Sequence, residues 1–137
     1  MGTRADFYIG IGRKSEWIGS IAWDGYPRGI PESILSSDTI KKFRRKVSEF
    51  LTIRDDATTP DKGWPWPWDN SKGTDFTYSF HRGKVYASEY GGSWFDPLSS
   101  PDGAETIVEL GVPKFPNMSK IKNVTLGRRS GLIVAQT

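Results

Sequence analysis

The stretch DFTYSFHRGKVYASEY, residues 75–90, alternates apolar and polar side chains on both sides of the pair Arg82–Gly83. A period of two is typical of a strand with one buried face, and a two-residue connection that contains glycine is typical of a hairpin turn. The stretch therefore predicts a β-hairpin in which Phe80 faces Val85. The expected core face holds Phe76, Tyr78, Phe80, Val85 and Ala87, and the opposite face holds Thr77, Ser79, His81, Lys84, Tyr86 and Ser88.

A second alternating stretch, DFYIGIGRKSEWIGSIAW at residues 6–23, has the turn-like sequence GRKS between its two halves. It predicts another β-hairpin, close to the start of the sequence. The alternation places Phe7, Ile9 and Ile11 on one side of the first strand, and Trp17, Gly19, Ile21 and Trp23 on one side of the second.

Residues 36–51, SSDTIKKFRRKVSEFL, have the apolar spacing of an amphipathic helix, and Ser36, Ser37 and Asp38 can cap its first turn. We expect two further short strands in residues 121–137, and a short edge strand interrupted by prolines in residues 107–118. Together these elements predict an α+β fold, with an antiparallel sheet of about six strands packed on one long amphipathic helix. The apolar helix positions are Ile40, Phe43, Val47, Phe50 and Leu51.

Length and composition restrict the class of protein. At 137 residues the chain has the length of one domain, and we expect a single domain over residues 1–137. The absence of cysteine excludes disulfides, thiol catalysis and thiolate metal ligands, and it favours an intracellular protein. The first residues do not resemble a secretory leader, and no apolar window is long enough to span a membrane. A formal net charge of +3 excludes an acidic mimic of DNA.

The loop GWPWPWDN, residues 63–70, places three tryptophans at alternate positions with prolines between them. Proline restricts its own backbone and that of the preceding residue, so the indoles would lose little entropy on meeting a partner. The loop is either a recognition segment or a lid whose indoles cover the core. We expect Trp66 to point inward and Trp64 or Trp68 to stay partly exposed. With the turn WFDP at residues 94–97, the candidate partner-binding residues are Trp64, Trp66, Trp68, Asp69, Trp94 and Asp96.

The outer face of the expected helix is basic, because KKFRRK at residues 41–46 contains five cations in six positions. Such a face is either solvated or in contact with nucleic acid or an acidic partner. The candidate basic patch comprises Lys41, Lys42, Arg44, Arg45 and Lys46.

No catalytic set is evident in the sequence. Its one histidine, His81, lies beside the expected hairpin turn, no serine has the surroundings of a nucleophile elbow, and no DxD or ExxH spacing indicates a metal site. We therefore expect no catalytic residue, no metal and no cofactor. The alternative is a small metal-independent nuclease that combines His81 with Lys84, Tyr86 and Glu89 across the hairpin.

Several motifs resemble those of a group of short proteins encoded by tailed phages and prophages. They are MGTRADFY, SIAWDGYP, TTPDKGWPWPW, GKVYAS, WFDP and KNVTLGRRSGLIV, and they cover most of the chain. The resemblance assigns no activity to any residue, but it implies an origin in which small accessory proteins often occupy a host surface. We therefore expect a binding protein of the host cytoplasm, an anti-CRISPR-like or host-takeover inhibitor whose partner is a host protein. A nucleic-acid-binding protein, acting through the basic patch and the tryptophans, is the alternative.

Overall fold

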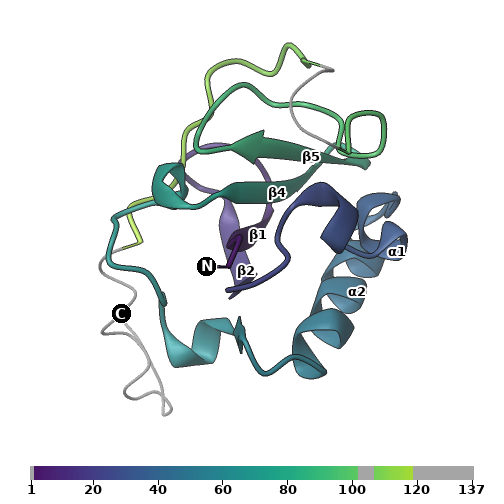
Figure 1. The fold of residues 1–137 in the computed structure, drawn as a ribbon. Helices are drawn as coiled ribbons and strands as arrows, with labels where there is room; N and C mark the ends of the chain where they lie inside the picture. Colours follow the sequence, from purple (N-terminus) through teal and green to yellow (C-terminus); the bar gives the residue numbers. More distant parts are fainter. Residues whose placement is uncertain (1, 102–106, 119–137) are drawn as a thin grey trace.

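The computed structural model describes residues 2–101 and 107–118, and these form a mixed β-sheet with helices on one face and long loops on the other (Figure 1). In the described part of the chain the sheet has five strands in the order β3-β2-β1-β4-β5. The elements are β1 (Ala5–Ile9), β2 (Glu16–Ile21), η1 (Pro27–Gly29), α1 (Glu32–Leu35), α2 (Ile40–Thr52), β3 (Ala57–Thr58), η2 (Pro60–Lys62), η3 (Ser71–Gly73), β4 (Phe76–His81) and β5 (Lys84–Glu89).

The α+β class and the single main helix are confirmed, but the expected antiparallel sheet of about six strands is matched only roughly. The two central strands, β1 and β4, are parallel, with Ala5 opposite Phe76 and Ile9 opposite Phe80. They are parallel because the chain between them crosses over through β2, both helices and β3 before it enters β4. The strands expected in residues 121–137 lie outside the described residues.

The hairpin predicted over residues 75–90 is confirmed in register. Phe80 lies opposite Val85 and Tyr78 lies opposite Ala87. Arg82 and Gly83 both have positive φ angles, 49° and 82°, as a type I′ turn requires. All five residues of the expected core face are buried against the helices.

The N-terminal hairpin differs from the prediction because β2 contains a bulge. Phe7 pairs with Gly19 and Tyr8 pairs with Trp17, so Ile18 is an extra residue and the alternation changes face there. Trp17 therefore packs on the loop side of the sheet, whereas Ile21 packs on the helix side. Ile11, which was expected beside Phe7 and Ile9, also packs on the loop side, and Trp23 lies beyond the strand in an exposed turn.

Glycine is required at the bulge. Gly19 has a φ of 148°, and a Cβ atom there would overlap the side chain of Leu51 and lie 3.2 Å from the carbonyl oxygen of Thr58. The bulge thus lets α2 approach the backbone of β2 closely.

The helix side of the sheet holds the first core, in which α2 contributes Phe43, Val47 and Leu51. The N-cap of α2 is Thr39, whose hydroxyl accepts a hydrogen bond from the amide of Lys42 at 3.1 Å, and not one of the three residues before it. Ile40, expected on the apolar face, is half exposed because it begins the first turn.

The loop side of the sheet holds a second core that the sequence pattern did not predict. Its buried members are Tyr8, Trp17, Trp64, Trp94, Phe115 and Met118. Residues 63–75 and 107–118 cover this face, so small polar side chains on the face opposite the first core are buried as well. These side chains include Thr77, Ser79 and Ser88.

Within the described residues, no helix combines the length and the apolar character that a membrane span needs.

Candidate interaction surfaces

The tryptophan loop is folded inward and anchored by Trp64. Trp64 is 3% exposed, meets Trp17 edge-on at a centroid distance of 5.2 Å, and donates its indole N–H to the carbonyl of Trp68 at 2.8 Å. Trp64, and not Trp66, is therefore the most buried indole of the loop, but Trp66 also directs its N–H inward to the buried Asp6, and Trp68 stays partly exposed as expected. The chain bends from Trp66 to Asn70 and does not continue as a straight ribbon, so Trp66 and Trp68 lie together, half-buried, with stacked rings 5.6 Å apart.

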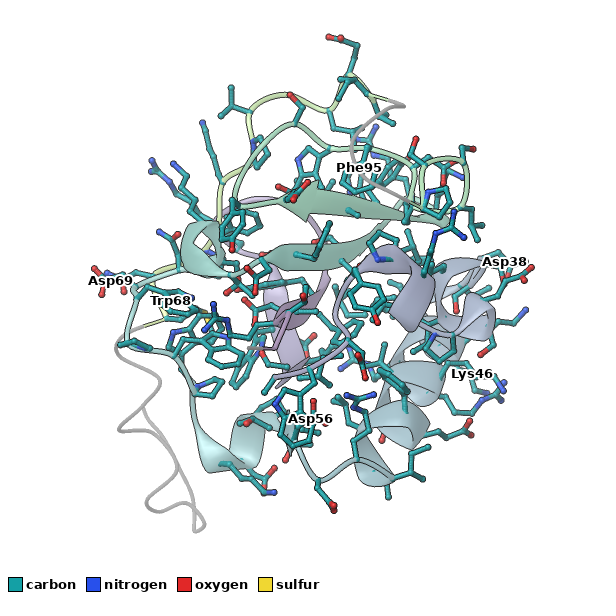
Figure 2. The ribbon with its side chains drawn as sticks, in the orientation of Figure 1. Asp38, Lys46, Asp56, Trp68, Asp69 and Phe95 are labelled. Carbon is teal, nitrogen blue, oxygen red and sulfur yellow. The ribbon has the colours of Figure 1, made fainter. Side chains whose placement is uncertain are left out.

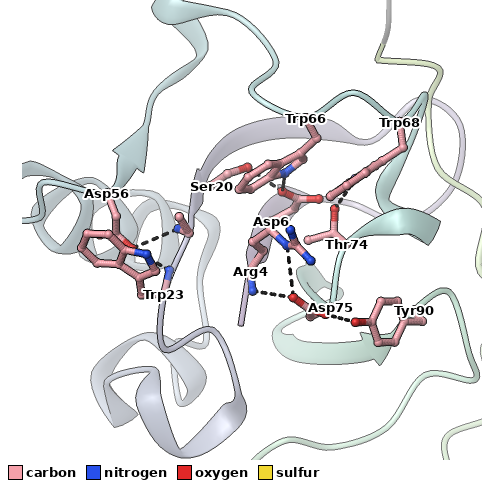
Figure 3. Close-up of polar contacts among 11 residues, drawn as sticks. Arg4, Asp6, Ser20, Trp23, Asp56, Trp66, Trp68, Thr74, Asp75 and Tyr90 are labelled. Carbon is pink, nitrogen blue, oxygen red and sulfur yellow. Dashed lines mark hydrogen bonds and ion pairs between the residues drawn. The ribbon is translucent and has the colours of Figure 1, made fainter. Parts of the chain in front are cut away.

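Arg4 covers this stacked pair of indoles (Figure 3). Its guanidinium carbon lies 5.9 Å from the ring centroid of Trp66 and 5.1 Å from that of Trp68, within cation–π range. Asp75 holds Arg4 in place, because it accepts hydrogen bonds from the backbone amide at 2.7 Å and from Nε at 3.3 Å, and it also accepts one from Tyr90. Burial of Asp75 raises its pKa, but these hydrogen bonds and the charge of Arg4 together hold the pKa below its usual value.

Asp6 is a buried carboxylate beneath the loop, and sequence reasoning missed it. Its Oδ1 accepts hydrogen bonds from the Ser20 hydroxyl at 2.6 Å and from the indole N–H of Trp66 at 2.7 Å. Its Oδ2 accepts one from the Ser71 hydroxyl at 2.6 Å. Asp6 has no exposed surface, and burial raises its pKa. The only sequence indication was an acid on a strand whose alternate residues are apolar.

All three indole N–H groups of the loop are therefore used inside the protein, since Trp68 donates to the Thr74 hydroxyl at 2.9 Å. The burial of Trp64 agrees with the interpretation of the loop as a lid whose indoles cover the core. Trp66 and Trp68 are half-buried and Asp69 is exposed. Trp68 and Asp69 lie at the edge of the protein, away from α2 (Figure 2). A role for these three residues in partner binding stays a prediction.

The WFDP turn also has a structural function. Trp94 is completely buried and packs against Phe115 at 5.9 Å, so it offers no surface to a partner in this conformation. Asp96 accepts hydrogen bonds from the amide of Leu98 and the hydroxyl of Ser99, each at 3.0 Å, and lies 3.2 Å from Nζ of Lys84. These contacts close the turn and dock it on β5.

The basic face of α2 is exposed, but part of its charge is neutralised. Lys42 pairs with Asp38 at 3.2 Å, Arg44 with Glu16 at 2.8 Å, and Lys46 with Glu49 at 3.7 Å. Lys41 and Arg45 have no acidic partner among the described residues, and they lie one helical turn apart.

Three further exposed cations, Arg13, Lys14 and Arg82, lie at the same end of the protein as the first turns of α2. The amide of Gly10 donates to the carbonyl of Phe80 at 2.7 Å, which places the β1–β2 turn beside the end of β4. The Arg44–Glu16 pair joins α2 to the start of β2, and Gly83 approaches the carbonyl of Asp38. We call this region the basic end; its exposed cations without an acidic partner in residues 2–101 and 107–118 are Arg13, Lys14, Lys41, Arg45 and Arg82.

The four residues of the alternative nuclease hypothesis do not form one cluster, although the rings of His81 and Tyr86 lie 6.4 Å apart. His81 lies opposite Lys84 at the turn, whereas Glu89 lies opposite Phe76 at the far end of the hairpin. Burial and the charge of Arg82 both lower the pKa of His81. Among the residues that the structure describes, no three His, Asp or Glu side chains gather as a metal site would require.

An aromatic hollow lies beyond the end of β2, at the opposite end of that strand from Glu16. Its volume is about 330 Å³, and Trp23 and Tyr26 within it are 55% and 42% exposed. Its lining residues, which define the aromatic hollow, are Gly2, Thr3, Trp23, Asp24 and Tyr26.

The backbone under Trp23 is held rigidly. Asp56 accepts hydrogen bonds from the amides of Ala22 and Trp23 at 3.0 and 2.8 Å, as Figure 3 shows. The guanidinium of Arg54 donates hydrogen bonds to both carboxylate oxygens of Asp56 and to the carbonyl of Trp23, the last at 2.8 Å. These contacts hold the pKa of Asp56 low although burial alone would raise it.

The turn that follows Trp23 is fixed to the body of the protein as well. The amide of Gly25 donates to the carbonyl of Thr3 at 2.8 Å, and the buried hydroxyl of Tyr78 donates to the carbonyl of Gly25 at 2.6 Å. Sequence reasoning missed this surface because alternation placed Trp23 beside Trp17 in the sheet. The indication available in the sequence was the aromatic pair within a turn rich in glycine and proline, WDGYP.

Comparison of the chain with protein-family models, with curated proteins and with solved structures finds no match.

Proposed function

We propose that this chain is a non-enzymatic binding protein of phage origin that occludes a surface of a host protein in the host cytoplasm, as an anti-CRISPR-like or host-takeover inhibitor. The observation that carries the proposal is the exposed Trp23 on a rigid backbone, with Tyr26 beside it. Tryptophan and tyrosine dominate the energetic centres of protein interfaces. An anchor that is already ordered loses little conformational entropy when it is buried by a partner.

The first prediction is that Trp23→Ala weakens binding to the host partner by about 2 kcal/mol or more while the melting temperature barely changes. The reason is that more than half of this side chain is exposed, so its truncation removes contact with the partner and little internal packing. The partner is identified by affinity capture from host lysate with mass spectrometry, and its affinity for each purified variant is then measured by calorimetry.

The matched control is Val112→Ala, which truncates an apolar side chain that is 75% exposed in a different part of the surface. This variant should bind like the wild type. If Trp23→Ala and Val112→Ala bind the partner equally well, the aromatic hollow is not the anchor and the proposal loses its support.

The second candidate function is nucleic-acid binding through the basic end. The observation that favours it is that five cations from α2 and from two neighbouring turns are exposed without an acidic partner in the described part of the chain. Cations spread over a rigid surface can each contact a phosphate and release a counterion.

The second prediction is that the double variant Lys41→Glu, Arg45→Glu loses at least about tenfold in affinity for a DNA duplex at low salt. It should also lower the slope of log affinity against log salt by about 2, because two phosphate contacts are lost. Fluorescence anisotropy with a labelled duplex measures both quantities. The control is Lys62→Glu, Lys72→Glu, which changes the net charge equally at exposed positions elsewhere; equal losses in the two double variants would show that only net charge matters.

A further inference from the structure

We infer that the aromatic hollow binds a guanidinium group, the side chain of an arginine that the partner protein presents. This inference rests on the proposed function, because it names the chemistry by which the host protein would be recognised. It stands on the aromatic surfaces, the charge and the rigidity of the hollow.

The aromatic surfaces suit a planar cation. Trp23 and Tyr26 both expose much of their rings at the hollow. Indole and phenol rings attract cations to their faces, and the attraction involves arginine more often than lysine. A guanidinium is also more weakly hydrated than an ammonium, so its transfer into such a hollow costs less.

The charge of the hollow is complementary to a cation. Asp24 is the charged side chain among the lining residues, and the neighbouring Asp56 and Arg54, which do not line the hollow, form an ion pair with each other. Arg54 is committed to Asp56 and to the carbonyl of Trp23. Asp24 accepts a hydrogen bond at Oδ1 from Tyr26 at 3.2 Å, whereas no described residue donates to its Oδ2. Asp24 therefore has an oxygen left to accept a hydrogen bond from an incoming guanidinium.

The hollow is also pre-formed. The backbone of Gly2 lies directly against the indole of Trp23, and a Cβ atom on Gly2 would overlap Cδ1 of that ring. Asp24 has a φ of 60°, a conformation that the hydrogen bonds of the adjoining Gly25 hold in place. A cation would thus meet the rings and the carboxylate already in position, without an ordering cost.

The third prediction tests this inference with two small probes of the same shape, N-acetyl-arginine amide and its neutral isostere N-acetyl-citrulline amide. Each is titrated into the ¹⁵N-labelled protein at matched ionic strength, and the indole N–H of Trp23 and the amides of residues 23–26 are followed by NMR. We expect saturable shifts of these signals with the arginine probe and at least about fivefold weaker binding of the citrulline probe. In Asp24→Asn this preference should decrease, because the charge of the carboxylate is lost and only the attraction of the rings for the cation remains.

Asparagine is the conservative choice at position 24, because it tolerates a positive φ and keeps an acceptor for Tyr26. Equal binding of the two probes, as for a merely apolar groove, would overturn the inference. So would the absence of saturable shifts at the hollow, or an arginine preference that is undiminished in Asp24→Asn. Host-protein binding that depends on Trp23 without an arginine preference would overturn this inference alone, whereas an arginine preference without Trp23-dependent host binding would overturn the proposed function alone.

Discussion

Replacing Trp64 by alanine is expected to destabilise the folded state by about 3–5 kcal/mol, as truncation of a buried aromatic side chain typically does. Trp64 is 3% exposed and belongs to the second core, where its ring meets Trp17 edge-on. Its N–H also holds the carbonyl of Trp68, so the loss of Trp64 would release the lid that covers Asp6. The free energy of unfolding is measured by urea denaturation followed by circular dichroism.

The control for this variant is Trp23→Ala, which removes the same side chain from an exposed position. It should change the free energy of unfolding by less than about 1 kcal/mol. A loss below about 1 kcal/mol in Trp64→Ala would mean that the tryptophan loop does not contribute to the core in solution. The loop would then be available as a recognition segment.

The sequence pattern correctly predicted the elements that depend on residues close together in the chain, namely the β4–β5 hairpin and the main helix. The β4–β5 register followed from the alternation of residues 75–90 and from the conformation that Arg82 and Gly83 adopt at the turn. The helix followed in the same way from its apolar spacing. Both features depend on residues within one short segment, so the sequence contains the whole pattern.

Three features of the fold depend on distant residues or on one extra residue, and the sequence did not predict them. The bulge at Ile18 moves Trp17 to the other face of the sheet. The parallel pairing of β1 with β4 joins segments that are separated by about half of the sequence. The second core depends on a loop that folds over the small polar residues Thr77 and Ser79, which by themselves indicate a solvated face.

These same features explain why the candidate interaction surfaces in the structure differ from those predicted from the sequence. The tryptophans of residues 64–68 and Trp94 mostly cover the second core, and Trp23 is the most exposed tryptophan among the described residues. The basic helix face was predicted, but the cations Arg13, Lys14 and Arg82 joined it only through the meeting of two turns at the end of the sheet. Surface chemistry that is assembled from several turns cannot be read from spacing along the chain.

Removal of the Asp6 carboxylate is expected to have the second large effect on stability, because three side chains on the loop side of the sheet donate hydrogen bonds to it. Asp6→Ala would leave the hydroxyls of Ser20 and Ser71 and the indole N–H of Trp66 without their acceptor. Each buried donor that loses its partner costs about 1–3 kcal/mol, and the hydroxyls can partly reorient. We therefore expect a total loss of about 3–5 kcal/mol in urea denaturation, while alanine at the exposed Asp69 should stay within about 0.5 kcal/mol of the wild type.

Asp6→Asn removes the ionisable group but keeps one acceptor oxygen in the side chain. Comparison with this variant therefore isolates the effect of ionisation on stability, and the direction of that effect with pH can be predicted. Burial raises the pKa of Asp6 in the folded state, so the unfolded chain releases this proton first as pH rises above about 4. The free energy of unfolding contributed by Asp6 is therefore present below its unfolded pKa and is lost as pH rises through the folded pKa. Asp56, Asp75 and Asp96 have lowered pKa values and act in the opposite direction at lower pH, but they are the same in both proteins. Urea denaturation across this pH range should thus give a wild-type stability that falls relative to Asp6→Asn as pH rises; a difference that is flat, or that rises with pH, would contradict a buried Asp6 that resists ionisation.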